Sequence, residues 1–386
     1  MKFIHTADWQ IGMTFRGFKE KTRILMEDDR FEVIEAIAKY AKDSKNGIDF
    51  VLVCGDMFDT PRIAESLVKK TLKKIERIEK PVYLLAGNHE WHGTEFIFAN
   101  KFFLENKPDN LHILTSGINK VEGLDSVEIL AAPLEGKEDD KDLIAEQLLN
   151  LSGSAGIRIL AGHGSIDKVM AAGGRKDLIA LAPIEKALSE GKVHYVAMGD
   201  RHSTTNVGDT GLVWYSGAPE PTDFDEDSQR NILSVEINKG EKAKVQAIEV
   251  GQWEFIRLGT KAKQYQLRKP EDLDEIEKLV DSAKRPSKTA IKIYCDSILD
   301  FDTNVRRGNL FDEWESETLA AFQVSESSIG TKVESDPLKE RAPEGLSGYA
   351  LDAYQDLKER AMSDAEDGEI ALEALKLLTA FAGGNK

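Results

Sequence analysis

The stretch Asp49-Phe-Val-Leu-Val-Cys-Gly-Asp-Met-Phe-Asp59 joins an apolar run to a glycine and then to two carboxylates. An apolar, valine-rich run bounded by glycine predicts a buried strand over 49–54 that ends in a sharp turn at Gly55. Asp56 would then stand directly beyond the carboxyl end of the strand. Alone the pattern is weak, because an aspartate after a strand commonly caps a helix.

The same arrangement recurs four more times along the chain. In layered α/β folds, ligands bind just beyond the carboxyl ends of the strands. We therefore expect five turns, spread over roughly 200 residues, to meet in one crevice. Each of the other four turns places an acid, an amide or an imidazole after an apolar run: Asp8-Trp9-Gln10, Gly87-Asn88-His89-Glu90, Gly162-His163-Gly164 and Gly199-Asp200-Arg201-His202.

Residues 1–250 alternate between short apolar runs and helical patterns, which predicts an α/β layered core. Helical patterns cover 29–43 and 63–79, each with apolar residues on one face. The later strands follow one another without long helices. We therefore expect hairpins, and two packed sheets flanked by helices on both sides, an α/β/β/α sandwich. The predicted strands are 2–6, 49–54, 81–86, 110–114, 127–132, 157–161, 193–198, 212–216, 231–237 and 244–250.

A second region begins near residue 251. Strand patterns at 253–258 and 290–295 flank a helix over 270–283 that opens with a proline and acidic residues. These elements predict a small α+β cap domain over 251–324. Residues 325–348 are polar, with scattered serine, proline and glycine, and are predicted to be a linker. Two amphipathic helices are expected within 349–386, over 349–361 and 370–381.

Composition narrows the class of protein. The chain has 386 residues, of which 41% are hydrophobic, and a net charge of −17, which opposes binding nucleic acid by bulk electrostatics. No apolar window reaches the roughly 18 residues needed to span a bilayer, and the N-terminus, which becomes polar after four residues, is expected to be a first strand and not a signal peptide. Cys54 and Cys295 lie in apolar runs, and we interpret them as reduced core thiols of a cytoplasmic protein.

The side chains at the turns suit divalent metal ions. Carboxylate, amide oxygen and imidazole together bind Mn²⁺, Fe²⁺, Zn²⁺ or Mg²⁺, whereas a set without thiolates is not typical of structural zinc. Two metals about 3.5–4 Å apart can activate a water and stabilise both the attacking and the leaving oxygen of a phosphoester. Taken alone, His163 would more often be structural. We assign His194, His112 and His92 to structure, and His5 could support the site from strand one.

These residues resemble the calcineurin-like metallophosphoesterases. That family carries Asp-x-His, Gly-Asp-x-x-Asp, Gly-Asn-His-Asp/Glu, a lone Gly-His, and Gly-His-x-His. The opening Phe3-Ile-His-Thr-Ala-Asp-Trp-Gln-Ile-Gly12 and the stretch Tyr215-Ser-Gly-Ala-Pro-Glu-Pro-Thr-Asp-Phe224 are similar to the SbcD-type nucleases, relatives of the meiotic-recombination-eleven repair nuclease. The resemblance covers about residues 1–250. It implies a hydrolase, an exo- and endonuclease acting in DNA double-strand-break repair.

The resemblance also implies a role for each residue. His89 would contact the scissile phosphate and help to protonate the leaving oxygen, which imidazole can do near neutral pH. The remaining positions would hold two metals: Asp8, Gln10 and His202 the first, Asn88, His163 and Asp200 the second, and Asp56 both.

Two positions depart from the family pattern, since Gln10 and Asp200 stand where histidines are usual. Each metal would lose one imidazole, and the site would become more negative and harder. This change favours Mn²⁺, with Mg²⁺ as the alternative, over Zn²⁺. The competing interpretation is a metal-poor, non-catalytic scaffold.

The resemblance further implies partners. SbcD-type nucleases act as dimers with SbcC, a coiled-coil ATPase, and the apolar faces at 349–361 and 370–381 suit helix docking, although packing on this protein's own surface is the equal alternative. Arg16, Lys19, Lys21 and Arg23 could touch DNA phosphates; an ordinary solvated loop is nearly as good an explanation. The other functional hypothesis is a phosphodiesterase or phosphatase for small molecules or phosphoproteins.

Overall fold

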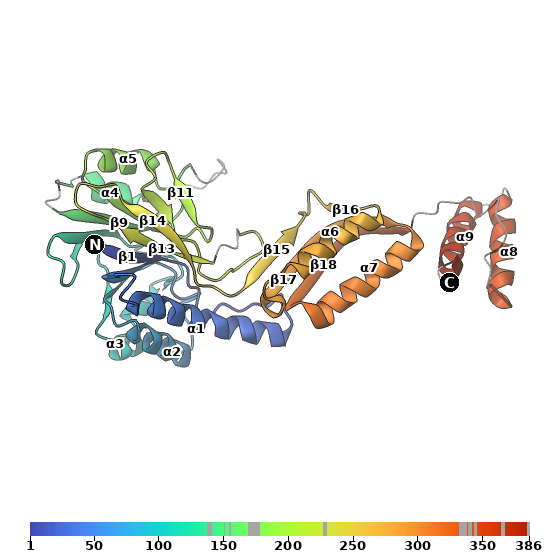
Figure 1. Cartoon of the computed structure of the whole chain (residues 1–386), viewed down its shortest axis with the longest axis horizontal. Coiled ribbons are helices and arrows are strands. Elements are labelled where there is room, and N and C mark those ends of the chain that lie inside the picture. The colour runs from blue at the N-terminus through green and yellow to red at the C-terminus, as the bar shows by residue number, and fades with distance from the viewer. Residues whose placement is uncertain are drawn as a thin grey trace. The chain divides into compact units, whose positions relative to one another are not determined.

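The computed structural model describes residues 1–136, 141–149, 151–153, 156–168, 178–226, 230–331, 338, 342, 346–363 and 367–383. The chain forms two compact units, a first unit over Met1–Glu254 and a second over Phe255–Lys386. Figure 1 shows the first unit in blue to yellow-green and the second in yellow to red.

Two six-stranded sheets form the centre of the first unit (Figure 1). In the first sheet, β1, β2, β3 and β6 run parallel, and β13 and β14 extend it antiparallel. Its order is β14 (Lys244–Glu249), β13 (Asn231–Glu236), β1 (Lys2–Thr6), β2 (Phe50–Cys54), β3 (Val82–Leu85) and β6 (Leu111–Ile113).

In the second sheet, β8, β9, β10 and β12 are parallel, and antiparallel strands form both edges. Its order is β11 (Thr205–Val207), β12 (Val213–Tyr215), β10 (Tyr195–Gly199), β9 (Ile157–His163), β8 (Val127–Ala132) and β7 (Gly117–Lys120). All ten predicted strands of this region are present to within two residues at either end.

The layers follow from which face of each strand is apolar. Between the sheets, Phe3 stacks on Phe50 at 4.9 Å between ring centroids, and Tyr195 meets Phe3 edge-on at 5.7 Å. The other face of the first sheet packs on α1 (Glu20–Lys42), α2 (Glu65–Glu76) and α3 (Lys101–Asn106). The other face of the second sheet packs on α4 (Leu143–Leu149) and α5 (Leu181–Ser189). The predicted α/β/β/α sandwich is confirmed.

Helix α1 begins nine residues before the predicted start at 29. Its first turns carry charged residues, and Ile24 and Leu25 are exposed there, so the apolar stripe appears only from Met26 onward. A small hairpin follows β3, formed by β4 (Trp91–His92) and β5 (Glu95–Phe96), with a 3-10 turn over Ile97–Ala99.

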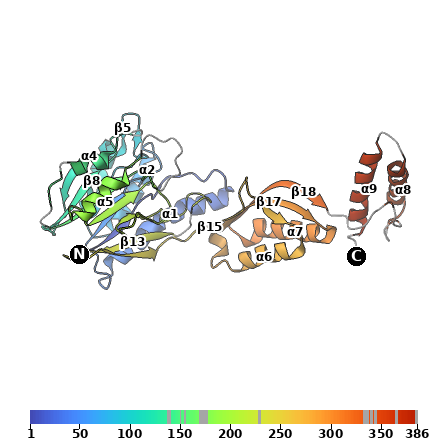
Figure 2. The ribbon, with the colours of Figure 1, turned by 90° about the horizontal axis from the view of Figure 1, so that it is seen from above.

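The second unit contains a four-stranded sheet of β15 (Glu254–Leu258), β17 (Thr289–Leu299), β16 (Tyr265–Leu267) and β18 (Ala321–Thr331). Helices α6 (Pro270–Asp281) and α7 (Phe301–Glu313) lie along one face of it (Figure 2). Pro270 opens α6, and the Asp272 carboxylate accepts the Lys269 backbone N–H at 3.1 Å. A 3-10 turn (Pro286–Lys288) precedes β17, and a π-helical turn (Trp314–Thr318) follows α7.

The predicted start of the linker at 325 is wrong. Residues 325–331 belong to β18, which pairs in parallel with β17 in a register that places Val324 opposite Ile293. The polar residues of this strand have weak strand propensity, so the sequence pattern does not predict it. Pairing with β17 outweighs that weak propensity. Most of the rest of the predicted linker, within 332–345, lies outside the described residues.

Two further helices, α8 (Tyr349–Met362) and α9 (Gly368–Gly383), match the predicted C-terminal pair and lie side by side (Figures 1 and 2). Tyr354, Ala371 and Leu375 are buried, whereas Tyr349, Met362, Ile370 and Leu377 are exposed. No helix among the described residues is long and apolar enough to cross a membrane.

Candidate metal centre

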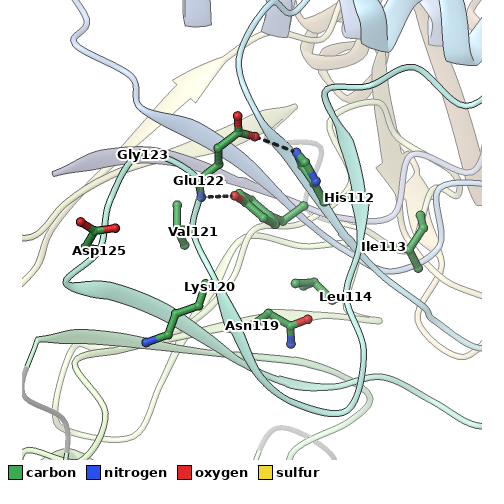
Figure 3. A pocket seen from close by; sticks show the side chains of 10 residues that line it. His112, Ile113, Leu114, Asn119, Lys120, Val121, Glu122, Gly123 and Asp125 are labelled. Carbon is green, nitrogen blue, oxygen red and sulfur yellow. Dashed lines mark hydrogen bonds and ion pairs between the residues drawn. The ribbon is translucent and has the colours of Figure 1, made fainter.

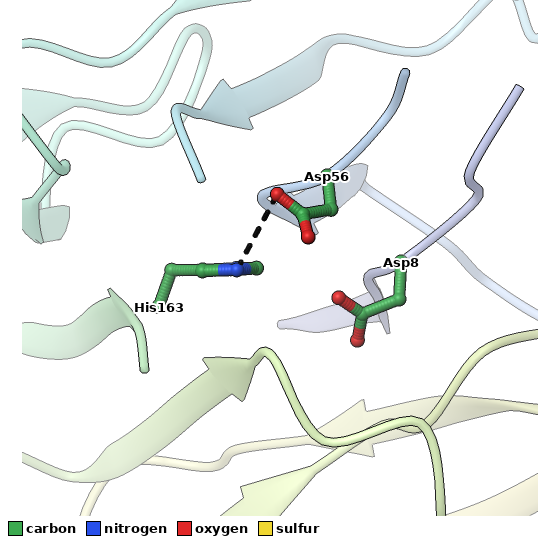
Figure 4. A group of neighbouring side chains, drawn as sticks. All are labelled: Asp8, Asp56 and His163. Carbon is green, nitrogen blue, oxygen red and sulfur yellow. Dashed lines mark ion pairs between the residues drawn. The ribbon is translucent and has the colours of Figure 1, made fainter. Parts of the chain in front are cut away.

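The strand ends of both sheets meet at one group of side chains. Asp8 follows β1, Asp56 follows β2, and His163 is the last residue of β9. One potential ligand atom from each of these three lies within 4.8 Å of the others, and all three are buried (Figure 4). Asn88, which follows β3, joins them, since its Oδ1 lies 3.0 Å from His163 Nε2. Residues 8, 56, 88 and 163 therefore do converge.

The backbone is strained where these residues sit. Among the described residues, six that are not glycine have positive φ, and four of them are predicted site residues: Asp8 (55°), Gln10 (49°), Asp56 (53°) and Asp200 (91°). Such conformations cost about 1–3 kcal/mol each and persist where the surrounding structure enforces them. Strained residues of this kind cluster at functional sites, and here they coincide with predicted site residues.

Glycines make room for the ligands. A Cβ on Gly55, whose φ is +88°, would lie 2.2 Å from His163 Nδ1, and a Cβ on Gly87 would lie 2.3 Å from Asp56 Oδ1. Neither position can therefore hold a larger residue without displacing a ligand. Gly55 and Gly87 are thus required by their close packing against His163 and Asp56.

The contacts of His163 fit a bound cation. Its Nδ1–H donates to the Cys54 carbonyl at 2.8 Å, which leaves Nε2 facing Asn88 Oδ1 at 3.0 Å and Asp56 Oδ1 at 3.4 Å. With neutral His163 and Asn88 Oδ1 turned toward it, these three atoms are all acceptors, and a cation or a proton between them removes the repulsion. Burial opposes charging the ring, but the Asp56 carboxylate raises the pKa of His163 well above its usual range.

The other side of Asp56 offers two more acceptors. Asp8 Oδ2 and Gln10 Oε1 are buried, and no donor among the described residues reaches either. Gln10 Nε2 donates to Asp56 Oδ2 at 3.1 Å, which aims its Oε1 elsewhere. Burial raises the pKa of Asp8 to about 7, and the neighbouring Asp56 and Asp200 carboxylates add to this rise. Buried oxygens without donors fit divalent metal ions.

Thr222 and Glu226 orient the His202 ring through its Nδ1 atom. Its Nδ1 lies 2.6 Å from Thr222 Oγ1 and donates to Glu226 Oε1 at 2.7 Å, which leaves Nε2 as the ring nitrogen that can accept. Burial opposes protonation, but the bond to Glu226 raises the pKa of His202 to about 9. Neither His202 nor Asp200 belongs to the described group that lies within 4.8 Å. Asp200 contacts Asp8 Oδ1 through its backbone N–H at 3.1 Å, and its Oδ2 accepts from Ser165 Oγ at 2.7 Å.

His89 lies at the open edge of the group. Its backbone N–H donates to Asp56 Oδ1 at 3.0 Å, and its Nδ1–H donates to the Asp59 carbonyl at 2.7 Å. The ring therefore presents Nε2, 3.9 Å from Asp56 Oδ2, and its side chain is 39% exposed. A ring held in this way can exchange a proton with a ligand that enters from solvent.

Sequence reasoning missed the residue that fixes two of the turns. The Glu90 carboxylate is fully buried and accepts three backbone N–H groups, from Asp56 at 3.0 Å, Gly87 at 2.8 Å and Phe58 at 3.1 Å. Burial, together with the Asp56 charge, raises the pKa of Glu90 to about 8. The only signal in the sequence was its place after Gly87-Asn88-His89.

The remaining histidines behave as structural residues. His5 is buried between Tyr195 Oη and the Met198 carbonyl, at 3.0 Å and 3.2 Å, so it braces β10 from strand β1. His194 Nδ1 accepts the Arg158 backbone N–H at 3.1 Å. His92 is exposed on the β4–β5 hairpin.

His112 stacks on Tyr83 beside a cavity of about 400 Å³ between the edge strands β6 and β7 (Figure 3). Its Nε2 lies 3.4 Å from Glu122 Oε2, and the Glu122 backbone N–H donates to Tyr83 Oη at 2.7 Å. The residues lining this cavity include none of the predicted ligands.

The basic residues predicted for DNA lie on the segment before α1 and on its first turns. Arg16, Lys19 and Lys21 are exposed, and Arg23 lies 3.9 Å from Glu27 one turn further along the helix. Lys21 and Arg23 are helical rather than part of a loop.

Comparison with known proteins identifies the class. The sequence profile of the calcineurin-like phosphoesterases matches residues 1–204, more than half of the chain, and the protein belongs to this family. A member uses divalent metal ions to hydrolyse phosphoesters, in agreement with the group around Asp56.

More particular likenesses are weaker. The chain is 33% identical over 94 residues to the SbcD component of the SbcCD nuclease of Bacillus subtilis (strain 168), which is 23% of this chain and 22% of that protein. It is 22% identical over 272 residues to the same component in Staphylococcus epidermidis (strain ATCC 12228 / FDA PCI 1200), a match that covers 62% of this chain and 67% of that protein. A dimetal phosphatase structure from Danio rerio covers 64% of this chain and 95% of its own, at 12% identity and a TM-score of 0.41.

Proposed function

We propose that the protein is a two-metal phosphodiesterase that cleaves DNA, as the nuclease component of an SbcCD-like break-repair complex. The observation that carries the proposal is the meeting of Asp8, Asp56, Asn88 and His163 around buried acceptor atoms that no described donor reaches. The similarity to the SbcD component of SbcCD nucleases favours DNA over other phosphoesters.

The residues around Asp56 would hold two divalent ions. Divalent ions so held supply charge for the phosphate oxygens and lower the pKa of water. The residues that would hold them are Asp8, Gln10 and His202 on one side, and Asn88, His163 and Asp200 on the other, with Asp56 shared. Five oxygen donors and two imidazoles favour Mn²⁺, or Mg²⁺, over Zn²⁺.

His89 would act on the leaving oxygen. Its Nδ1–H is committed to the Asp59 carbonyl, so Nε2 is the atom that exchanges a proton. The part-exposed ring could approach the scissile phosphate and deliver that proton as the bond to the leaving oxygen breaks.

The partners are proposed on the same basis. We expect a cytoplasmic homodimer that works with an SbcC-like coiled-coil ATPase, whose helices would cover the exposed Tyr349, Met362, Ile370 and Leu377 of α8 and α9. Arg16, Lys19, Lys21 and Arg23 would lie along the DNA backbone and provide local positive charge on an acidic protein.

The test is cleavage of end-labelled linear DNA by the full chain with Mn²⁺, alone and with the ATPase. Asp56→Asn is the inactive control, since it removes the shared charge. Cleavage by the wild type and its loss in this variant are expected. If neither form cuts DNA under either condition while cyclic nucleotides or phosphopeptides are hydrolysed, the substrate is a different phosphoester.

One contact favours the metal-poor scaffold. Gln10 Nε2 already donates to Asp56 Oδ2, so the amide shares an oxygen that one ion would need. Elemental analysis of protein purified without chelator and supplied with Mn²⁺ decides between the metal-poor scaffold and the two-metal enzyme. Metal near zero supports a scaffold, and about two ions per chain support the enzyme.

A further inference from the structure

Residues 220–226 contact the Nδ1 side of the His202 ring. Thr222 Oγ1 and Glu226 Oε1 both lie within 2.7 Å of His202 Nδ1. The Thr222 backbone N–H donates to Glu226 Oε2 at 2.9 Å, so the two residues hold each other as well as the ring. Because the imidazole has one ring nitrogen fixed, its other nitrogen is aimed in one direction.

Arg30 joins this segment to the turn after β1 that carries Asp8 and Gln10. Its side chain is buried, with Nη1 donating to the Trp9 carbonyl at 2.9 Å and Nη2 to the Pro221 carbonyl at 2.7 Å. Trp9 stands between Asp8 and Gln10 in the chain. One guanidinium therefore spans the turn after β1 and the segment that holds His202, in a planar geometry that lysine cannot reproduce.

Glu220 attaches the same segment to the end of the first unit. Its buried carboxylate accepts the Gln252 backbone N–H at 2.6 Å and the Trp253 backbone N–H at 3.0 Å. The Trp253 indole N–H in turn donates to Asp29 Oδ2 at 2.9 Å, next to Arg30 on α1. The chain passes into the second unit directly after these residues.

We propose that residues 220–226 form a positioning strap for the His202 side of the metal centre, anchored by Arg30 and by Glu220. The inference rests on the proposed function, because it assigns the strap to a metal ligand. Both anchors act on the strap and its neighbours through backbone carbonyl and N–H groups, not through the His202 ring. Glu220 also links the strap to the chain at 252–253.

The test uses the full chain labelled with ¹⁵N-histidine. In the wild type, the hydrogen-bonded Nδ1–H of His202 is expected as a downfield proton resonance, identified by its disappearance in His202→Gln. Glu220→Gln keeps the size of the anchor but leaves one backbone N–H facing an NH₂ group, and Arg30→Lys can reach only one of the two carbonyls. Both should broaden or shift the resonance. Glu241→Gln, a change of the same kind at an exposed Lys244 pair, should not.

Mn²⁺ titration by calorimetry provides the second readout. We expect both anchor variants to weaken one of two binding events about tenfold, in the range seen for residues that orient a ligand, and to leave the other event unchanged. Circular dichroism checks folding, and if Arg30→Lys does not fold, Glu220→Gln decides. An unchanged resonance in Glu220→Gln, with Glu226→Gln altering it, overturns the strap. Absence of DNA cleavage by a wild type that binds Mn²⁺ would instead refute the nuclease proposal alone.

Discussion

Replacing Glu90 with alanine should be among the single changes that most reduce stability, apart from changes at the predicted metal ligands. The carboxylate accepts three backbone N–H groups, from Asp56, Phe58 and Gly87, and it is fully buried. Truncation leaves all three donors without their acceptor in a closed part of the core. The effect should appear in stability even when no metal or substrate is present.

The magnitude follows from those three donors. A buried donor left unsatisfied costs about 1–3 kcal/mol, and entry of water into the vacated space would satisfy part of the set. We expect a loss of about 3–5 kcal/mol, and a smaller loss of about 2–3 kcal/mol for Glu90→Gln, whose amide keeps one acceptor oxygen.

Urea unfolding of metal-free protein measures the change. Four of the five tryptophans, at 9, 91, 214 and 253, belong to the first unit, so fluorescence reports mainly on it. With a urea dependence of about 2–3 kcal/mol per M, the midpoint should fall by about 1–2 M. Glu95→Gln, which removes an exposed pair with Arg62, should cost less than about 1 kcal/mol. If Glu90→Ala is no more destabilised than this control, the three N–H contacts do not have the assigned importance.

Three further outcomes are expected. Burial lowers the pKa of His5 from 6.5 to about 3, so between these pH values the unfolded chain binds a proton that the folded chain does not. The free energy of unfolding should therefore fall as pH drops below about 6.5, by up to ~1.4 kcal/mol per pH unit. His5→Asn should reduce this slope, as measured by urea unfolding at several pH values. Gly55→Ala should push His163 off the Cys54 carbonyl and weaken one Mn²⁺-binding event by about 100-fold in calorimetry, and an unchanged titration would contradict the steric argument. His89→Asn should slow DNA cleavage by about 100-fold but slow hydrolysis of a p-nitrophenyl phosphodiester much less, since that leaving oxygen needs no proton; equal losses would argue against proton delivery.

The strand ends were predictable because the physical requirement is local. An apolar run that must stop at a buried sheet edge needs a turn residue, and Gly55 directly follows β2 and Gly87 lies in the loop after β3, whereas Gly162 lies within β9, which continues to His163. The polar residues at or just beyond these strand ends are then brought close to one another. The convergence of Asp8, Asp56, Asn88 and His163 follows from this rule.

The supporting contacts were not predictable, because they join residues far apart in the chain. Glu226 lies 24 positions from His202, and Arg30 lies 191 positions from Pro221. No periodicity encodes such pairs. Strand β18 was hidden for a related reason: its polar residues are typical of a linker, and only pairing with β17 makes it a strand.

Grouping several buried acids at the metal centre costs folding free energy, as the pKa values of their carboxyls indicate. Burial raises the pKa of the Asp8 carboxyl to about 7 and that of Glu90 to about 8, and the Asp56 charge adds to both rises, whereas at Asp56 the imidazole of His163 outweighs burial and lowers the pKa. A crevice that concentrates acids in this way, on strained backbone, is destabilising by itself. Binding of cations to the folded form alone offsets that cost by mass action. Metal affinity and stability of the first unit should therefore rise and fall together.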